Sequence, residues 1–197
     1  MTELTIIIPV YNEDKNIAKE LEVLESTLKT EHIINIIYDN EDDTTIPVVN
    51  KEMKKYNSKI NLIKNLYGYG VSNAIKTGLK TAETEYVIVT MADLSDPPEV
   101  IEKMLQQAKK VNADIVCASR YMPGGKQIGG PIIKGLMSRF AGLSLYLFAG
   151  IKTHDATNSF KLYRKSFINE QTIESHDGFE LGLELVVKAH LSGNIIT

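Results

Sequence analysis

Two aspartates lie between a short apolar segment and a pair of prolines. The segment from Tyr86 to Glu99 reads YVIVTMADLSDPPE, in which β-branched and aromatic residues predict a buried strand and Pro97-Pro98 ends the turn before a helix. Asp93 and Asp96 therefore follow the carboxyl end of a strand, where open parallel sheets bind their ligands. A carboxylate there suits a hard divalent cation, which neutralises a diphosphate. Asp96 is expected to cap the helix, so we predict a metal–nucleotide site at Asp93.

The first apolar run ends in an aromatic ring with a carboxylate close by. Pro9, Tyr11 and Glu13 follow one another at the end of this run. A ring and a carboxylate at that position suit a nucleotide, because the ring can stack on the base and the carboxylate can accept hydrogen bonds from the base or its ribose. A loop in which Asn12 or Asp14 caps the next helix is an equal alternative.

Two further turns carry unusual composition. The turn from Asp39 to Asp43 holds four acids in five residues, a pattern that suits the donors of a base and ribose better than a bare phosphate. The segment Asn65–Gly70, NLYGYG, leads into a helix but matches neither the dinucleotide nor the P-loop pattern. We interpret its glycines as permitting a close approach of the backbone.

The composition of the 197-residue chain is typical of a globular protein, and its net charge is −3. This charge argues against nucleic acid as the main partner. Cys117 lies in an apolar run, which predicts a buried thiol in a reducing compartment. Glu3 directly precedes the first apolar run and no apolar run reaches the length of a membrane span, so a cytoplasmic protein without a signal peptide is expected.

Apolar strands alternate with amphipathic helices as far as Ser119. Strands that are apolar throughout and separated by helices are typical of a parallel sheet covered on both faces, so the sequence predicts a Rossmann-like α/β fold. The expected strands are 4–10, 33–38, 60–64, 86–89 and 113–119, and the expected helices are 15–30, 46–56, 71–81, 99–111 and 134–149.

The last of these helices combines basic and apolar residues. Lys134, Ser138 and Arg139 have the spacing i, i+4, i+5, so they can gather on one side of the helix and bind a phosphate. A solvated face is the alternative interpretation. Most of the remaining residues are apolar, so the helix either packs in a core or lies on a bilayer with its basic end at the headgroups.

These segments, in this order, resemble family-2 glycosyltransferases of the GT-A fold. The resemblance extends from Leu4 to Gly193, and its later motifs are similar to the branch that includes dolichyl-phosphate mannosyltransferase and bacterial polyprenyl-phosphate glycosyltransferases. The matching motifs are PVYNE at 9–13, the acidic turn, NLYGYG at 65–70, MADLSDPPE at 91–99, SRY at 119–121, Gly124-Gly125, Ser138-Arg139, DATNSFK at 155–161 and GFE at 178–180.

The resemblance implies one catalytic domain, 1–197, with a mainly parallel central sheet. Residues 1–120 would form its nucleotide-binding half and residues 121–197 its acceptor-binding half. The implied reaction is an inverting transfer of a sugar from a nucleotide-diphosphate sugar to a polyprenyl phosphate, with Mg²⁺ or Mn²⁺ and a peripheral contact at the cytoplasmic face of a membrane. A glycosyltransferase acting on a saccharide hydroxyl and a non-catalytic nucleotide-sugar-binding relative are the alternatives.

The strand-end residues and the resemblance together give an expected site. Asp155 would lie near the donor sugar and orient the acceptor, or act as the base for a hydroxyl acceptor, and Asp93 would be the other catalytic residue. The metal is expected at Asp93 and Ser95, and the acceptor phosphate at Lys134, Ser138 and Arg139. The nucleotide sugar is expected at Pro9, Tyr11, Glu13, Asp39, Ala92, Asp93 and Arg120.

The chain departs from the family pattern at three acidic or basic positions. The usual Asp-Ala-Asp reads Met91-Ala92-Asp93, and the first Asp of the turn after the second strand is Tyr38. One fewer anionic ligand should weaken metal binding in the free protein, although a diphosphate can complete the shell. Lys161 stands where the family has arginine, which keeps the positive charge without the bidentate fork. The resemblance also predicts a further strand and a basic loop beyond Thr197, as in a fragment or a trimmed chain.

Overall fold

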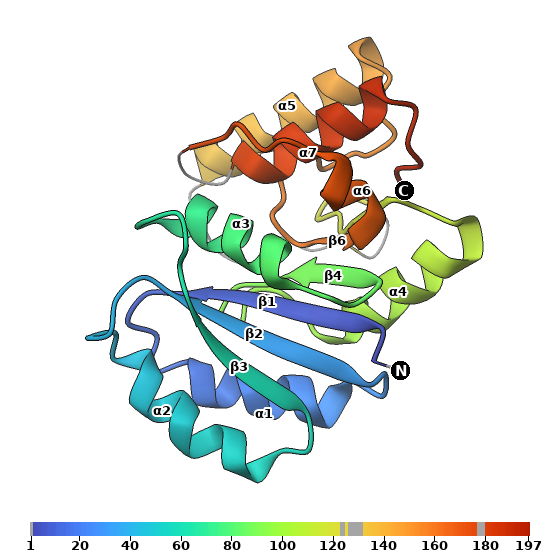
Figure 1. The fold of residues 1–197 in the computed structure, drawn as a ribbon. Helices are drawn as coiled ribbons and strands as arrows, with labels where there is room; N and C mark the ends of the chain where they lie inside the picture. Colours follow the sequence, from blue (N-terminus) through green and yellow to red (C-terminus); the bar gives the residue numbers. More distant parts are fainter. Residues whose placement is uncertain (1, 123–124, 126–131, 177–179) are drawn as a thin grey trace.

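The computed structural model describes residues 2–122, 125, 132–176 and 180–197, with the backbone alone at 132–138 and 141. It is an α/β fold built on one six-stranded sheet, in the order β3-β2-β1-β4-β6-β5 (Figure 1). The strands are β1 (Leu4–Val10), β2 (His32–Tyr38), β3 (Lys59–Lys64), β4 (Tyr86–Val89), β5 (Ile115–Cys117) and β6 (Lys161–Arg164). The helices are α1 (Ile17–Thr27), α2 (Thr45–Glu52), the short 3₁₀ turn η1 (Met53–Lys55), α3 (Val71–Thr81), α4 (Glu99–Val111), α5 (Ile132–Phe148), α6 (Lys165–Glu170) and α7 (Glu180–Leu191).

The predicted parallel sheet is confirmed, with one reversed strand. β1 pairs in parallel with β2 and β4, and β2 pairs in parallel with β3. β6 runs antiparallel between β4 and β5, so a strand from the second half of the chain joins two from the first half. β6 is absent from the predicted strands because its four residues, KLYR, are too few and too polar to give an apolar run.

Most predicted elements occupy their expected ranges, and the differences lie at their ends. β1, α3 and α4 match the prediction residue for residue. α1 is shorter at both ends, and its capping residue Leu28 is extended, with ψ 133°. α2 ends at Glu52 and continues as the 3₁₀ turn η1. α4 ends at Val111, and the left-handed backbone of the capping residue Asn112 stops the helix.

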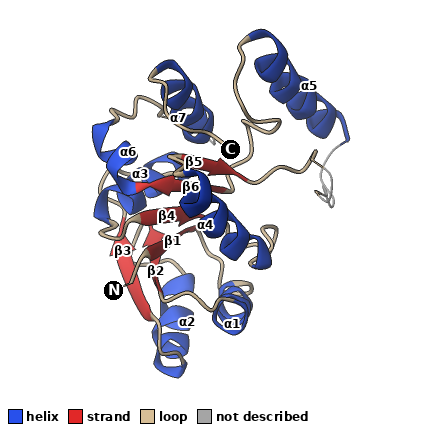
Figure 2. Ribbon diagram, turned by 90° about the vertical axis from the view of Figure 1, so that its right-hand side faces the viewer, coloured by secondary structure: helices blue, strands red, loops and turns tan. Residues whose placement is uncertain are grey.

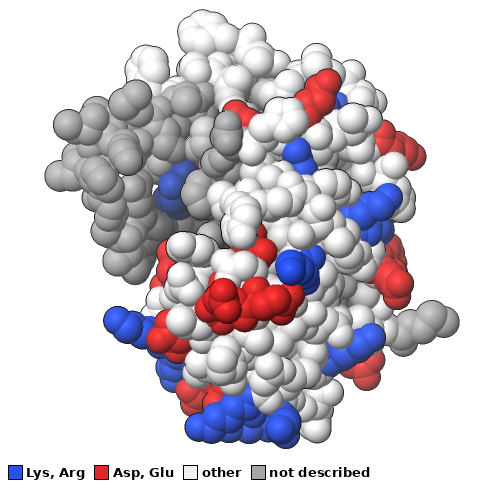
Figure 3. Space-filling view, turned by 60° about the vertical axis from the view of Figure 1, so that its left-hand side comes forward, with Lys and Arg blue, Asp and Glu red and all other residues white. Residues whose placement is uncertain are grey.

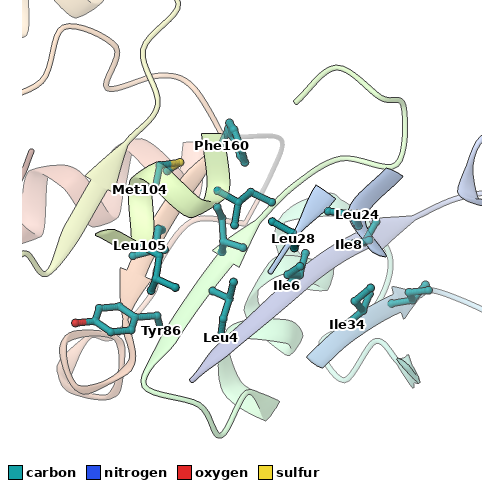
Figure 4. Packing of buried hydrophobic residues seen from close by; sticks show 14 of the residues in the cluster. Leu4, Ile6, Ile8, Leu24, Leu28, Ile34, Tyr86, Met104, Leu105 and Phe160 are labelled. Atoms are coloured by element: carbon teal, nitrogen blue, oxygen red, sulfur yellow. The ribbon is translucent and has the colours of Figure 1, made fainter. Parts of the chain in front are cut away.

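Helices cover both faces of the sheet, as strands that are buried along their whole length require (Figure 2). Alternate side chains of β1 point to opposite faces. Leu4, Ile6 and Ile8 pack against α1 and α4 in the first core (Figure 4). Ile7 belongs to the second core, which includes residues of α3, α6 and α7. The apolar positions predicted to line α1 are buried, namely Ile17, Leu21, Leu24 and Leu28.

α5 packs closely against the segment that follows it, and the chain end pairs with β5. A Cβ atom on Gly142 of α5 would lie 2.6 Å from the carbonyl oxygen of His154, so only glycine fits there. The His154 ring stacks on Tyr146 with the ring centroids 4.2 Å apart. At the chain end, Ile196 pairs in parallel with Ile115 of β5. Among the described helices, none combines the length and the apolar character that a membrane crossing requires.

The cysteine lies at the edge of the core. Cys117 is a free thiol, half-buried at the end of β5, and packs against the second core. Burial raises the pKa of its thiol, which disfavours the reactive thiolate. Cys117 is thus a core residue near the edge of the sheet. It is more exposed than the fully buried thiol that the apolar run predicts.

One carboxyl group is buried in the first core without a hydrogen-bond partner. Glu20 of α1 is 1% exposed, and both of its carboxyl oxygens are unpartnered within the described part of the chain. Burial, followed by the negative charges of Asp96 and Asp93, raises the pKa of Glu20 to about 7. At pH 7 the Glu20 carboxyl of the folded protein is therefore protonated in about half of the molecules, whereas that of the unfolded chain is ionised.

Replacing Glu20 with Gln should remove part of the pH dependence of stability. The pKa of Glu20 is higher in the folded protein than in the unfolded chain. The bound proton therefore stabilises the fold fully below about pH 4.5, and this stabilisation is lost as the pH rises to about 7. We expect the Glu20→Gln variant to exceed the parent by about 3 kcal/mol at pH 8 and to match it near pH 4.5, in metal-free urea unfolding. Glu22→Gln, at an exposed position of the same helix, is the control. Parallel pH profiles for Glu20→Gln and the parent would contradict the assignment.

Candidate functional site

A cavity of about 490 Å³ lies at the carboxyl ends of β1 and β2. Its lining includes four residues predicted to bind a nucleotide, Pro9, Tyr11, Glu13 and Asp39. Figure 3 looks toward this edge of the sheet and shows acidic side chains gathered near the middle of the face. Because the carboxyl ends of parallel strands meet at one edge, residues far apart in the sequence come together there.

The loops after β1 and β2 hold each other in place. The backbone N–H of Asn12 donates to both carboxylate oxygens of Asp43 at 3.2 Å, and that of Glu13 donates to Thr45 Oγ1 at 2.9 Å. Asp43 is 2% exposed, so this acid of the turn is structural. The alternative role of Asn12 or Asp14 as a helix cap is wrong, because α1 begins after Asn16 and has no side-chain cap.

Asp39 links the acidic turn to the glycine-containing loop. Its two carboxylate oxygens accept hydrogen bonds from Asn65 Nδ2 at 2.8 Å and from the backbone N–H of Gly70 at 2.9 Å. Gly68 and Gly70 adopt φ values of 89° and 108°, which explains why the loop contains glycine. The turn between them places Tyr69 on the cavity wall, 72% exposed.

Tyr69 is a site residue that the sequence analysis missed. An aromatic side chain between two glycines, just beyond a strand end, is the signal that could have identified it. The exposed ring forms part of the cavity wall, so its face is open to a molecule in the cavity. Together with Tyr11, which is 66% exposed, it offers two rings at one cavity.

The two aspartates after β4 have different environments. Asp93 is exposed, and its Oδ1 accepts a hydrogen bond from the Ser95 N–H at 3.0 Å. The predicted capping role of Asp96 is wrong. Its Oδ2 accepts from the Met91 N–H at 3.2 Å and Thr90 Oγ1 at 3.3 Å, and α4 begins after Pro98 without a side-chain cap. Burial raises the pKa of Asp96 to about 6.

The residues predicted to hold a metal provide one exposed carboxylate. Among the described residues, no three His, Cys, Asp or Glu side chains are grouped so as to bind a metal ion. Met91, at the position of the missing first aspartate, lines the cavity instead, and Ala92 is buried. Asp93 fits a Mg²⁺ or Mn²⁺ ion that takes most of its oxygen ligands from a diphosphate and water.

Arg120 and Asp155 form an ion pair in which the carboxylate is buried and the arginine side chain is 29% exposed. Asp155 is fully buried, and its carboxylate accepts from Arg120 Nε at 2.8 Å, Arg120 Nη2 at 2.7 Å and the Arg120 backbone N–H at 3.1 Å. These bonds raise the pKa of the Arg120 guanidinium. The structure thus unites two residues to which the sequence analysis gave separate roles, one toward the donor and one toward the acceptor.

The segment 155–161, which contains Asp155, is held by two further hydrogen bonds. The Asn158 side chain donates to the Ala118 carbonyl oxygen at 3.0 Å, and the Lys161 ammonium donates to the Asn158 carbonyl oxygen. Lys161 is fully buried, and desolvation lowers its pKa. Lysine at this position therefore acts inside the protein, without reaching a ligand.

The predicted phosphate-binding residues lie on α5. Arg139 is exposed, and its guanidinium carbon lies 5.7 Å from the centroid of the Tyr121 ring. Lys134 and Ser138 lie in α5, but their side chains are outside the described part, as are Gly178 and Phe179. The grouping of Lys134 and Ser138 with Arg139 stays a prediction.

This strand order, with a cavity at the carboxyl ends of parallel strands, defines the GT-A class of glycosyltransferase folds. The structure of glucosyl-3-phosphoglycerate synthase from Mycobacterium tuberculosis with Mn²⁺, UDP-glucose and phosphoglyceric acid superposes with a TM-score of 0.72 at 12% identity, covering 100% of this chain and 68% of that one. S. aureus TarS 1–349 in complex with UDP gives 0.65 at 23% identity, covering 98% and 56%. These likenesses confirm the predicted fold.

The chain belongs to glycosyl transferase family 2, whose model matches residues 5–171. Dolichol-phosphate mannosyltransferase of Pyrococcus furiosus is 29% identical over 195 residues, which cover 96% of this chain and 54% of that protein. An uncharacterized glycosyltransferase of Synechocystis sp. is 29% identical over 175 residues, covering 85% and 52%. The chain therefore spans about half the length of these two relatives. The resemblance to the family is confirmed.

Breaking the Arg120–Asp155 pair should destabilise the fold. In Asp155→Asn the amide cannot accept the same charge-assisted bonds from Arg120, and we expect a loss of about 3 kcal/mol in urea unfolding. Asp42→Asn, at an exposed position, should change stability by less than about 0.5 kcal/mol. In a double-mutant cycle with Arg120→Met, the two changes should be strongly non-additive. Additive effects would show that the two residues act independently.

Proposed function

We propose that this chain transfers a sugar from a nucleotide-diphosphate sugar to a polyprenyl phosphate, with inversion at the anomeric carbon. The observation that carries the donor half is the cavity at the carboxyl ends of β1 and β2, with Asp39 in its wall and Asp93 exposed in the turn after β4. The acceptor half is supported by the similarity to dolichol-phosphate mannosyltransferase over 96% of the chain.

The cavity supports binding of the nucleoside. The exposed rings of Tyr11 and Tyr69 provide faces for stacking, while Glu13 and Asp39 are acceptors for hydrogen bonds from a base or ribose. Asp39 is held by Asn65 and Gly70, so its orientation is set before a ligand arrives. A preorganised acceptor loses less entropy when the ligand binds.

A divalent cation would neutralise the leaving diphosphate. Asp93 would hold Mg²⁺ or Mn²⁺ together with the diphosphate oxygens, and Ser95 orients Asp93 through its backbone N–H. The M. tuberculosis synthase, which shares the fold, was crystallised with Mn²⁺ and UDP-glucose, and this supports a divalent metal. With the first aspartate replaced by Met91, the affinity for the metal should depend strongly on bound nucleotide.

The chemistry places few demands on a general base. An oxygen of the acceptor phosphate attacks the anomeric carbon from the face opposite the diphosphate, and the bond from that carbon to the diphosphate oxygen breaks with its electron pair. A phosphate is already anionic, whereas a saccharide hydroxyl must lose a proton. Asp155, the predicted base, is fully buried and accepts three hydrogen bonds from Arg120. This arrangement favours the phosphate acceptor.

The outer surface of α5 favours contact with a lipid bilayer. Phe140 is 73% exposed, Leu147 61% and Phe148 89%, and Arg139 is exposed on the same helix. Large apolar side chains exposed together mark an interaction surface, and a basic residue beside them suits anionic headgroups. A bilayer would bring a polyprenyl phosphate to the middle of α5, where Arg139 lies. We place the protein at the cytoplasmic face of a membrane.

Donor and acceptor can be tested together. The protein is incubated with UDP- and GDP-sugars, with and without undecaprenyl phosphate and Mn²⁺, and nucleoside diphosphate release and glycolipid are measured. We expect release that needs both the lipid and the metal. Asp93→Ala should abolish Mn²⁺-dependent nucleotide binding in calorimetry, whereas Asp42→Ala should not. Transfer to a saccharide hydroxyl alone would overturn the lipid acceptor, and nucleotide binding without any transfer would indicate a non-catalytic relative.

Membrane contact can be tested by flotation with vesicles containing anionic phospholipid. The parent protein should float with the vesicles, and Phe140→Ser with Phe148→Ser should reduce the bound fraction at least tenfold, because two large apolar side chains no longer enter the interface. Leu66→Ser, which changes an exposed leucine outside α5, is the matched control. Equal flotation of all three proteins would place the membrane contact elsewhere.

A further inference from the structure

Two arginine side chains from distant parts of the chain contact one aromatic ring. The guanidinium carbon of Arg120 lies 5.2 Å from the centroid of the Tyr121 ring, and that of Arg139 lies 5.7 Å from the same point. Both distances lie within the range of cation–π attraction. Tyr121 therefore connects α5 to the strand end that carries the Arg120–Asp155 ion pair.

The backbone around Tyr121 is tightly constrained. The Tyr121 N–H donates to Ser119 Oγ at 3.2 Å, and the Gly125 N–H donates to the Met122 carbonyl oxygen at 2.8 Å. A Cβ atom on Gly125 would lie 2.3 Å from the Ser119 carbonyl oxygen, so position 125 cannot accept another residue without a shift of the backbone. Close contacts at Ser119 and at Gly125 therefore restrict the backbone on either side of Tyr121.

The charges of the two arginines are compensated differently. Asp155 neutralises Arg120 through a bidentate ion pair. Arg139 is exposed, and no ion pair forms on it among the described residues. Asp155 cancels the charge of Arg120 but not that of Arg139. The three groups together therefore carry one positive charge, which attracts an anion.

We propose that Tyr121 is a positioning residue of the acceptor-phosphate site, and that its ring holds Arg139 of α5 beside the Arg120–Asp155 pair. The inference rests on the proposed function, because the anion it assigns to this site is the acceptor's phosphate. A long arginine side chain on an exposed helix surface samples many rotamers, and contact with a fixed ring reduces that freedom before the phosphate binds. Tyr121 itself makes no bond to the reacting atoms.

The test compares two substitutions at Tyr121. Tyr121→Phe keeps the aromatic face and should match the parent. Tyr121→Leu keeps apolar bulk without the ring, and should raise the KM for undecaprenyl phosphate about fivefold, the factor that corresponds to one exposed cation–π contact. The KM for the nucleotide sugar and kcat at saturating acceptor should stay unchanged.

Arg139→Gln provides the second arm, because an exposed side chain can be changed without loss of the fold. It should raise the acceptor KM at least as much as Tyr121→Leu, and adding Tyr121→Leu to it should have no further effect. This pattern remains measurable if Tyr121→Leu fails to fold, since Arg139→Lys, a weaker partner for the ring, should then lie between the parent and Arg139→Gln.

The outcomes separate this inference from the proposed function. If the parent transfers sugar to the lipid phosphate and Tyr121→Leu keeps the parental acceptor KM, the positioning role is wrong and the function stands. Multiplicative effects of Tyr121→Leu and Arg139→Gln on the acceptor KM would also overturn it. If the parent neither binds nor glycosylates the lipid phosphate, the proposed acceptor and the positioning role both fail.

Discussion

The ion pair between Arg120 and Asp155 connects the parts of this protein. A carboxylate without solvent contact is stable as an anion only when a cation and hydrogen bonds replace its lost water, and Arg120 supplies three N–H groups for this purpose. The pair fastens the segment before β6 to the end of β5. The neighbouring Tyr121 ring contacts both Arg120 of this pair and Arg139 of α5.

The strand ends determine the rest of the site. Asp39 fixes the glycine loop, Asp43 fixes the loop after β1, and Asp96 fixes the turn after β4. The acidic residues that follow the strands therefore stabilise different loops. Several of them accept hydrogen bonds from backbone N–H groups; of these, Asp39 also lines the cavity and Asp93 is also exposed.

The sequence was informative where local pattern determines structure. β1, α3 and α4 followed from apolar runs and helical spacing, and four of the residues that line the cavity followed from the rule that strand ends meet at one edge. β6 could not be predicted in this way, because a short polar strand is defined by its neighbours in the sheet. The partner of Asp155 and the cavity position of Tyr69 depend on tertiary packing, which no local pattern encodes.

The reversed strand has a consequence for the order in which the molecule can assemble. β1 to β4 pair among themselves, so that part of the sheet can form as soon as residue 89 has been synthesised. β5 joins the sheet through β6, whose residues are made more than forty positions later. Long-range pairing of this kind is slow, because a long loop must close first. We expect a nascent chain to form the cavity at the ends of β1 and β2 early, while the Arg120–Asp155 pair forms only after both ends of that loop have emerged.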